Sequence, residues 1–143
     1  MIDELNDTAL VTKNGYYGAC NWCSRSNGDR ALGQIVEVTS VSGSTVGFNP
    51  PLYWTLSPTL SPQTVAFSPG VKYAGVESLT VKCNNTGYAS NFNMEGVAYC
   101  WVKNVEGDHT EGDHADCWWS FRCEFRDSYF HDAFVYKIGR AHV

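Results

Sequence analysis

Apolar and polar residues alternate in three similar phrases in the second half of the chain. The phrases are Val76–Val81, Val102–Gly107 and Phe125–Phe130, offset by 26 and then 23 residues. The first position of each phrase is apolar, the second is charged, and the third is a short polar residue. Alternation over so short a run is typical of a β-strand.

A period in this range is typical of a solenoid, in which each unit buries its apolar face by stacking on its neighbours. A helical solenoid would need about ten or more residues with a 3.6-residue period, and the sequence has no such stretch. The third-position residues suit turns and local backbone hydrogen bonds. The sequence therefore predicts an all-β solenoid, in which the strands 76–81, 100–106 and 123–130 stack in parallel.

A hairpin is predicted in the first half of the chain, over residues 35–48. Gln34–Val41 alternates, Ser42–Ser44 contains the turn glycine, and Thr45–Phe48 forms the returning strand. Residues 1–30 are polar and rich in Gly and Asn, and they predict loops with short strands.

All five prolines lie between residues 49 and 73, which predicts an extended loop. We expect its aromatic and leucine side chains to anchor it. We divide the chain into a loop and hairpin region (1–73) and solenoid coils (74–136). The expected anchors are Leu52, Tyr53, Trp54 and Phe67.

The end of the chain matches a different kind of sequence. Ile138–Val143 is one possible translation of a common short-read sequencing adapter, and the adapter also completes the codon of Lys137. We therefore expect 137–143 to be an artefact and exclude it from fold reasoning. The alternative is a genuine C-terminal hexapeptide. On the first interpretation the chain is a metagenomic fragment, and the missing coils of the same chain follow residue 136.

Three phrases, Gly75–Val81, Cys100–Val105 and Cys123–Asp132, resemble the right-handed parallel β-helix of pectate lyases and their relatives. The resemblance covers about residues 74 to 134. It implies a bacterial-type β-helix in which a strand ends at a small polar residue, and these residues stack into a ladder. The positions that fit this ladder are Ser78, Asn104 and Asp127.

The sequence departs from that pattern at two positions. Gly107 leaves the last apolar column without a side chain, and Ser128 stands where Leu79 and Val105 occur in the other phrases. The fold carries lyases, hydrolases, esterases, adhesins and phage tailspikes, so the resemblance does not select one reaction.

Net charge, apolar runs and cysteine content indicate which classes of partner and location to expect. The formal net charge is −5 and the chain has no basic run, which argues against binding of nucleic acid. No apolar run approaches the roughly 20 residues that span a membrane. Six cysteines are unusual for a cytosolic chain of 143 residues, so we expect a secreted or cell-surface protein.

The densest polar cluster is Gly107–Asp116. The 23-residue offset places Asp108 over His131 and His109 over Asp132, and neighbouring strands lie about 4.8 Å apart. Four alternating acidic and imidazole groups on one edge can hold a divalent metal or act as a general base. Imidazole favours zinc-like ions and carboxylates alone favour calcium. The alternative is a solvated acidic loop.

Within the same cluster we assign metal binding to a set of four residues, and the cofactor that we expect is Ca²⁺. The four residues are Asp108, Asp113, His114 and Asp116.

The outward second position of the phrases holds Glu77, Lys103 and Arg126. Lys103 and Arg126 repel each other when stacked, and a bound anion relieves this repulsion. Arg126 can bind a carboxylate with two parallel hydrogen bonds. The resemblance implies a basic groove in which an arginine abstracts a proton and calcium bridges a uronate to aspartates. The alternative is a row of ordinary surface charges.

Aromatic residues crowd the same coils, and exposed flat rings stack on sugars. The alternation points Trp101 outward, so Trp101 is the preferred sugar platform, and Glu77 of the outward second position is assigned to substrate binding as well. Packing inside the solenoid is the alternative. The other aromatic residues of these coils are Tyr99, Trp118, Trp119 and Phe121.

Two cysteines, Cys100 and Cys123, are 23 residues apart and should stack inside neighbouring coils. Either a disulfide or a ladder of buried thiols fits this spacing. Cys20 and Cys23 predict a local disulfide or a clip to another cysteine, Cys83 or Cys117.

Two hypotheses of function follow. The first is a carbohydrate-active lyase or hydrolase of acidic polysaccharide, which places catalysis on the outward basic residues and the Asp–His edge. The second is a non-catalytic binding protein, such as an adhesin or a tailspike-like shaft. The catalytic candidates are Lys103, Arg126, Asp108, His109, His131 and Asp132, and the substrate-binding candidates are Trp101 and Glu77.

Overall fold

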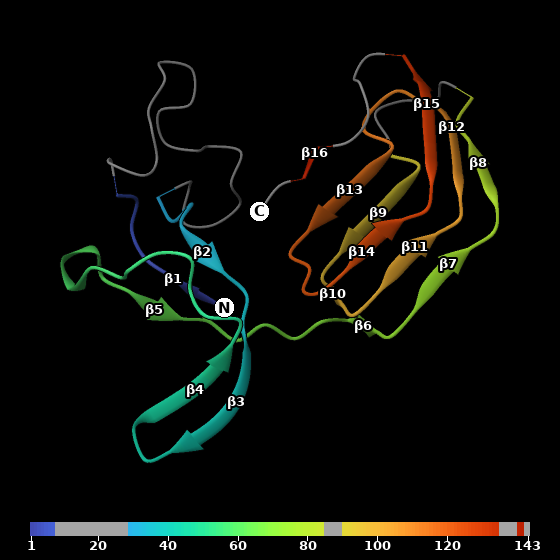
Figure 1. The fold of residues 1–143 in the computed structure, drawn as a ribbon. Coiled ribbons are helices and arrows are strands. Elements are labelled where there is room, and N and C mark those ends of the chain that lie inside the picture. Colours follow the sequence, from blue (N-terminus) through green and yellow to red (C-terminus); the bar gives the residue numbers. More distant parts are fainter. Residues whose placement is uncertain (8–28, 85–89, 135–139, 142–143) are drawn as a thin grey trace. The chain divides into compact units, whose positions relative to one another are not determined.

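A computed structural model describes residues 1–7, 29–84, 90–134 and 140–141 (Figure 1). The described chain is built from short strands, and its helical part is a single 3₁₀ turn, Pro58–Leu60. The prediction of an all-β protein is therefore confirmed. No helix in this part of the chain is long and apolar enough to cross a membrane.

The chain forms two compact units, Met1–Phe67 and Ser68–Val143. The first contains a three-stranded antiparallel sheet of order β2-β1-β5 and a hairpin, β3–β4. The hairpin prediction is confirmed, and Gly43 supplies the positive φ of 58° that its two-residue turn requires. The strands are β1 (Ile2–Asp3), β2 (Gly33–Gln34), β3 (Glu37–Ser42), β4 (Thr45–Asn49) and β5 (Gln63–Thr64).

The proline-rich segment is held in the first unit by a carboxylate. Trp54 Nε1 and the Ser57 backbone N–H donate hydrogen bonds of 2.9 and 2.8 Å to the two oxygens of Glu4, which is almost fully buried. Tyr53 is 80% exposed, so the expectation that it anchors this loop is wrong. An exposed ring two residues after a proline pair needs no partner, whereas a buried carboxylate requires donors.

The second unit consists of stacked parallel strands, visible in Figure 1 as neighbouring arrows of similar direction. Each stack takes one strand from each successive turn of the chain, so every strand pairs with strands about one repeat away. The stacks are β6 (Val71–Lys72) with β10 (Val97–Ala98); β7 (Gly75–Glu77), β11 (Trp101–Lys103) and β14 (Glu124–Arg126); β8 (Thr80–Lys82), β12 (Glu106–Thr110) and β15 (Tyr129–Ala133); and β9 (Phe92–Glu95), β13 (Ala115–Trp118) and β16 (Arg140–Ala141).

The register of these stacks is the one that the repeat predicts. Val102 of β11 lies opposite Val76 on one side and Phe125 on the other. In the middle coil Val102 is only 4% exposed and belongs to an apolar core with four other residues. The predicted register is therefore confirmed, and Val102 and Phe125 belong to or contact the core, whereas Val76 of the first coil is 39% exposed. The other members of this core are Phe92, Met94, Cys100 and Val105.

Each predicted strand is broken into two by a corner, which corrects the strands 76–81, 100–106 and 123–130. The corner residues Ser78, Asn104 and Asp127 have φ of 58°, 51° and 51°. Short polar residues tolerate this left-handed conformation better than most others. The third column of the repeat therefore marks corners between two strand stacks.

Left-handed residues recur every five positions along the two later coils. Because each corner stacks on the corner of the next coil, the 23-residue offset keeps strands and bends aligned. The corner residues are Tyr99, Asn104 and His109 in one coil and Arg122, Asp127 and Asp132 in the next.

Gly107 faces inward in β12, where its neighbours in the column are Val81 and Phe130. A Cβ atom at this position would lie 2.7 Å from Phe130 Cδ1, 3.0 Å from His114 Nδ1 and 3.1 Å from Asn91 Oδ1. The absence of a side chain at Gly107 therefore leaves room for the hydrogen-bonded pair of Asn91 and His114 and for the ring of Phe130.

The described cysteines, Cys83, Cys100, Cys117 and Cys123, are free thiols. Cys100 and Cys123 sit at equivalent places, since their Sγ atoms donate to the carbonyl oxygens two residues earlier, at 3.4 and 3.5 Å. Burial raises the pKa of Cys123. Of the two alternatives the structure contains the thiol ladder, and the predicted clip to Cys83 or Cys117 is wrong. Cys20 and Cys23 lie outside the described residues.

Two residues of the tail, Arg140 and Ala141, pair in parallel with Asp116 and Cys117. This pairing uses backbone groups that any sequence provides. It therefore does not bear on the expectation that 137–143 derives from an adapter.

The Gly107→Ala substitution should destabilise the protein by about 1–3 kcal/mol, because the added methyl group overpacks the interior. Gly70→Ala is the matched control, since nothing lies within 4 Å of its Cβ position. Urea denaturation of both variants and the parent chain measures the difference. Equal unfolding midpoints for Gly107→Ala and Gly70→Ala would contradict the close contact.

Candidate functional site

The outward surface of the stack β7-β11-β14 carries two columns of side chains. Trp101 lies between Gly75 and Glu124, and Lys103 lies between Glu77 and Arg126. The register therefore brings together on one face all four residues that the sequence assigned to it: Glu77, Trp101, Lys103 and Arg126.

The Trp101 indole packs over Gly75 of the neighbouring strand. A Cβ atom on Gly75 would come within 2.1 Å of Trp101 Cε2 and 2.2 Å of its Nε1, so the indole covers the place where a side chain would stand. The Trp101 Nε1–H donates a 2.6 Å hydrogen bond to Glu77 Oε1. Gly75 makes room for the ring and Glu77 fixes its rotation, so the two predicted substrate-binding residues form one unit.

The two basic residues of this face have different surroundings. Arg126 is about half exposed and its Nε lies 3.0 Å from Glu124 Oε1 in the same strand. The stacked charges thus include carboxylates on both sides, Glu77 and Glu124, which offset Lys103 and Arg126. The anion-binding clamp predicted for Arg126 is partly occupied by the protein itself.

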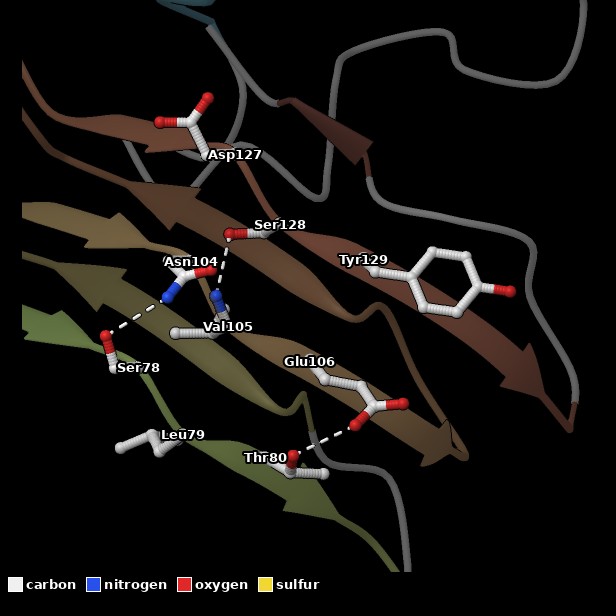
Figure 2. A pocket seen from close by; sticks show the side chains of 9 residues that line it. All are labelled: Ser78, Leu79, Thr80, Asn104, Val105, Glu106, Asp127, Ser128 and Tyr129. Carbon is white, nitrogen blue, oxygen red and sulfur yellow. Dashed lines mark hydrogen bonds between the residues drawn. The ribbon is translucent and has the colours of Figure 1, made fainter.

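An open groove of about 500 Å³ follows the corner between the stacks β7-β11-β14 and β8-β12-β15 (Figure 2). Three consecutive residues of each coil line it, beginning with the corner residue. The lining is largely hydroxyl, amide and carboxylate groups: Ser78–Thr80, Asn104–Glu106 and Asp127–Tyr129.

Hydrogen bonds between coils order this groove. Asn104 Nδ2 donates to Ser78 Oγ at 3.1 Å, which forms the polar ladder implied by the repeat for two of its three members. The Val105 N–H donates to Ser128 Oγ at 3.3 Å, and Ser128 Oγ donates to the Arg126 carbonyl at 2.8 Å. Ser128, which departs from the repeat, therefore links two coils by a hydrogen bond. Figure 2 shows this bond to Val105 together with the bond between Asn104 and Ser78.

The predicted Asp–His edge is present on the outward side of β12 and β15. Asp108 pairs with His131 in register, and Thr110 pairs with Ala133, so His109 lies across from Asp132. His131 Nδ1 is 2.8 Å from Asp132 Oδ2 and 3.7 Å from Asp108 Oδ1. His109 Nδ1 contacts the same oxygen of Asp108.

Neighbouring charges shift the pKa values of this edge. Asp132, and then Glu106, raise the pKa of His131, because both ring nitrogens donate to carboxylates. His131, and then Thr80, lower the pKa of Glu106. The carboxylates beside the two ring nitrogens therefore favour the protonated form of His131.

Lys82, with its Nζ 2.6 Å from Asp108 Oδ2, lowers the pKa of Asp108, and His109 adds to this effect. Asp108 is thus ionised with one oxygen held by Lys82 and the other facing the two histidines.

The predicted metal set is not assembled as proposed from the sequence. Among the described residues, the ligand atoms within 4.8 Å of one another belong to Asp108, His131 and Asp132. Asp116 accepts hydrogen bonds from the Cys117 N–H and from Trp118 Nε1. Asp113 is half-buried and is outside this group as well.

His114 is fully buried inside the coil, which corrects its assignment as a metal ligand on the surface loop. Its ring stacks on Phe130 at 5.7 Å, and Nδ1 donates to Asn91 Oδ1 of the preceding coil. Nε2 has no hydrogen-bond partner among the described residues. The sequence did not predict the burial of His114, because a histidine that follows an aspartate in a polar segment is typical of an exposed loop.

Three contributors were missed from the sequence: Thr80, Lys82 and Glu106. Thr80 Oγ1 donates to Glu106 Oε2 at 2.9 Å, and His131 Nε2 lies 3.0 Å from Glu106 Oε1. The 26-residue offset already placed Thr80 beside Glu106 and Lys82 beside Asp108. Extending the repeat alignment outward from the apolar columns would have found them.

A second aromatic group lies at another corner. Tyr73 and Tyr99 are stacked with centroids 5.0 Å apart, and Tyr99 meets Phe121 edge-on at 5.8 Å. The Arg122 guanidinium lies 5.8 Å from the Tyr99 ring. Phe121 is buried, so for this residue core packing is confirmed over a surface role.

Comparison with protein families, with curated proteins and with solved structures gave no match.

The pKa values of two described histidines, His114 and His131, should be shifted in opposite directions from the ordinary value. Burial lowers the pKa of His114 below 6.5, and its carboxylate partners raise the pKa of His131 above 6.5. As the pH falls, His114 becomes protonated in the unfolded chain at a higher pH than in the folded protein. Acidification below about pH 6.5 therefore lowers the free energy of unfolding. For His131 the stabilisation is present below that pH and is lost as the pH rises through its folded-state pKa.

Two-dimensional NMR of the imidazole nitrogens across pH 4.5 to about 8.5 measures both midpoints against the ordinary value. His114→Asn and His131→Gln assign the signals. A His114 midpoint at or above that of His131 would contradict the buried and paired environments.

Proposed function

We propose that residues Ser68–Val143 are part of a right-handed parallel β-helix. Four stacks of parallel strands, aligned corners and an apolar interior support this fold. Crossovers between parallel strands are right-handed in nearly all proteins, which supports the hand.

We propose that this β-helix binds polysaccharide on the outward face of β7-β11-β14, as a secreted or cell-surface protein. One observation carries the proposal: the Trp101 indole lies against Gly75 and is locked by Glu77. A sugar ring can stack on an indole that is fixed in place, because C–H groups meet the π-face while hydroxyls bond at the edge. A ring pre-oriented in this way loses little conformational entropy on binding.

The groove at the adjacent corner supports an extended ligand. Its hydroxyl, amide and carboxylate groups can bond sugar hydroxyls, and it begins one residue after Lys103 and Arg126 in their coils. Glu77 and Glu124 balance Lys103 and Arg126, so this face does not favour an acidic chain over a neutral one. Aromatic stacking, and not charge, is the main attraction.

Binding without catalysis fits the contacts better than an elimination reaction. An arginine base must be free of a carboxylate, and Arg126 is paired with Glu124. Asp132 and Glu106 raise the pKa of His131, which favours its protonated form over the free base that proton abstraction requires. An adhesin-like or tailspike-like binding shaft is therefore preferred to a lyase or hydrolase.

The Trp101→Ala variant should bind polysaccharide about tenfold more weakly, since aromatic stacking contributes about 0.5–1.5 kcal/mol beyond buried area. Affinity electrophoresis in gels with neutral β-glucan, xylan or polygalacturonate measures the retardation. Tyr53→Ala removes a more exposed aromatic ring from the first unit and should leave the retardation unchanged.

Gly75→Ala is the sharper variant, because it keeps the indole and displaces it. The added Cβ cannot coexist with the ring in its present place, so binding should weaken as much as in Trp101→Ala. Retention of full binding by Gly75→Ala would show that the platform orientation is irrelevant. The absence of binding to every glycan tested would end the proposal.

An assay for release of unsaturated or reducing sugars from polygalacturonate, with and without Ca²⁺, separates binding from catalysis. We expect no turnover in either condition. Calcium-dependent turnover that Arg126→Lys abolishes would instead assign the chain to lyase chemistry.

A further inference from the structure

We propose that Asp108, His131 and Asp132 form a binding site for a divalent ion of the zinc class. The ligands lie on the β8-β12-β15 stack and use none of the residues of the Trp101 face, whereas the supporting residues Thr80 and Glu106 also line the corner groove.

The donor atoms converge from two coils. One ligand atom each of Asp108, His131 and Asp132 lies within 4.8 Å of the other two, and His131 Nδ1 is 3.7 Å from Asp108 Oδ1 and 2.8 Å from Asp132 Oδ2. Three protein ligands leave the fourth position of a tetrahedral zinc site to water. His109 Nδ1 contacts Asp108 but lies outside this group.

The partners outside this set hold the ligands in the orientation that an ion requires. Glu106 Oε1 accepts from His131 Nε2 at 3.0 Å, so Nδ1 is the nitrogen directed at the aspartates. Thr80 Oγ1 in turn donates to the other oxygen of Glu106. A carboxylate behind a ligating histidine is the usual support of a metal site, since it fixes the ring and makes the ligand nitrogen more basic.

Lys82 performs a similar role for Asp108. Its Nζ donates to Oδ2 at 2.6 Å, which leaves Oδ1 to face the two histidines. Ligands and supporting groups thus come from three successive coils, and only the stacking of β8, β12 and β15 brings them together.

The donor types select the ion. Calcium takes six to eight oxygen ligands, whereas imidazole nitrogen suits zinc and its neighbours. The site therefore differs from the expected Ca²⁺ site at Asp108, Asp113, His114 and Asp116 in both ligands and metal.

Calorimetric titration of the full chain with Zn²⁺, without an affinity tag, tests the site. We expect one ion per chain at this site, and at least about tenfold weaker binding for His131→Gln and for Asp132→Asn. Co²⁺ gives an independent readout, since imidazole and carboxylate ligation produces visible absorption without the near-ultraviolet band of thiolate ligation. That band separates this site from the cysteines of the chain.

Asp127→Asn is the matched control for Asp132→Asn. Both aspartates occupy left-handed corners of the same coil, five residues apart, and both substitutions remove one negative charge. Asp127→Asn should leave the affinity for Zn²⁺ unchanged. Equal affinities of the parent chain and Asp132→Asn, or an equal loss in Asp127→Asn, would overturn the site, as would a preference for Ca²⁺.

Discussion

In-register pairing of parallel strands one coil apart is the constraint on which the second unit depends. Each strand is only two to five residues long and cannot bury its apolar face alone. Stacking places Val76, Val102 and Phe125 in one inward row and aligns the left-handed corners at the same time. A shift by one residue would turn the interior outward and put a strand against a bend.

The same register creates the functional surfaces. Because side chains alternate, every inward row is accompanied by outward columns whose members lie in adjacent coils. One such column sets Trp101 against Gly75, and another sets Asp108 between Lys82 and His131. A binding surface in this architecture is therefore a property of several coils together, and no single coil contains it.

Buried polar groups mark where the repeat is irregular. Asn91 and His114 are 23 residues apart and meet inside the unit, where the absent side chain of Gly107 leaves room for them. In the sequence pattern alone, Gly107 is a departure from the repeat and His114 is predicted to be a metal ligand in a surface loop. Neither error could be avoided from alternation alone, because the chain between β12 and β13 turns back into the interior at a residue type that is usually exposed.

The sequence by itself determined the all-β class, the hairpin, the offsets of 26 and 23 residues and the inward row, since these follow from local alternation and its recurrence. It also placed Asp108 near His131, because pairing partners follow from the offsets, whereas the hydrogen bond between Trp101 and Glu77 emerged only from the structure. Only the tertiary structure decided the corners that split each strand, the burial of His114 and the contacts of Arg126 with Glu124. These depend on backbone φ and on side-chain packing between coils, which a pattern of residue types does not specify.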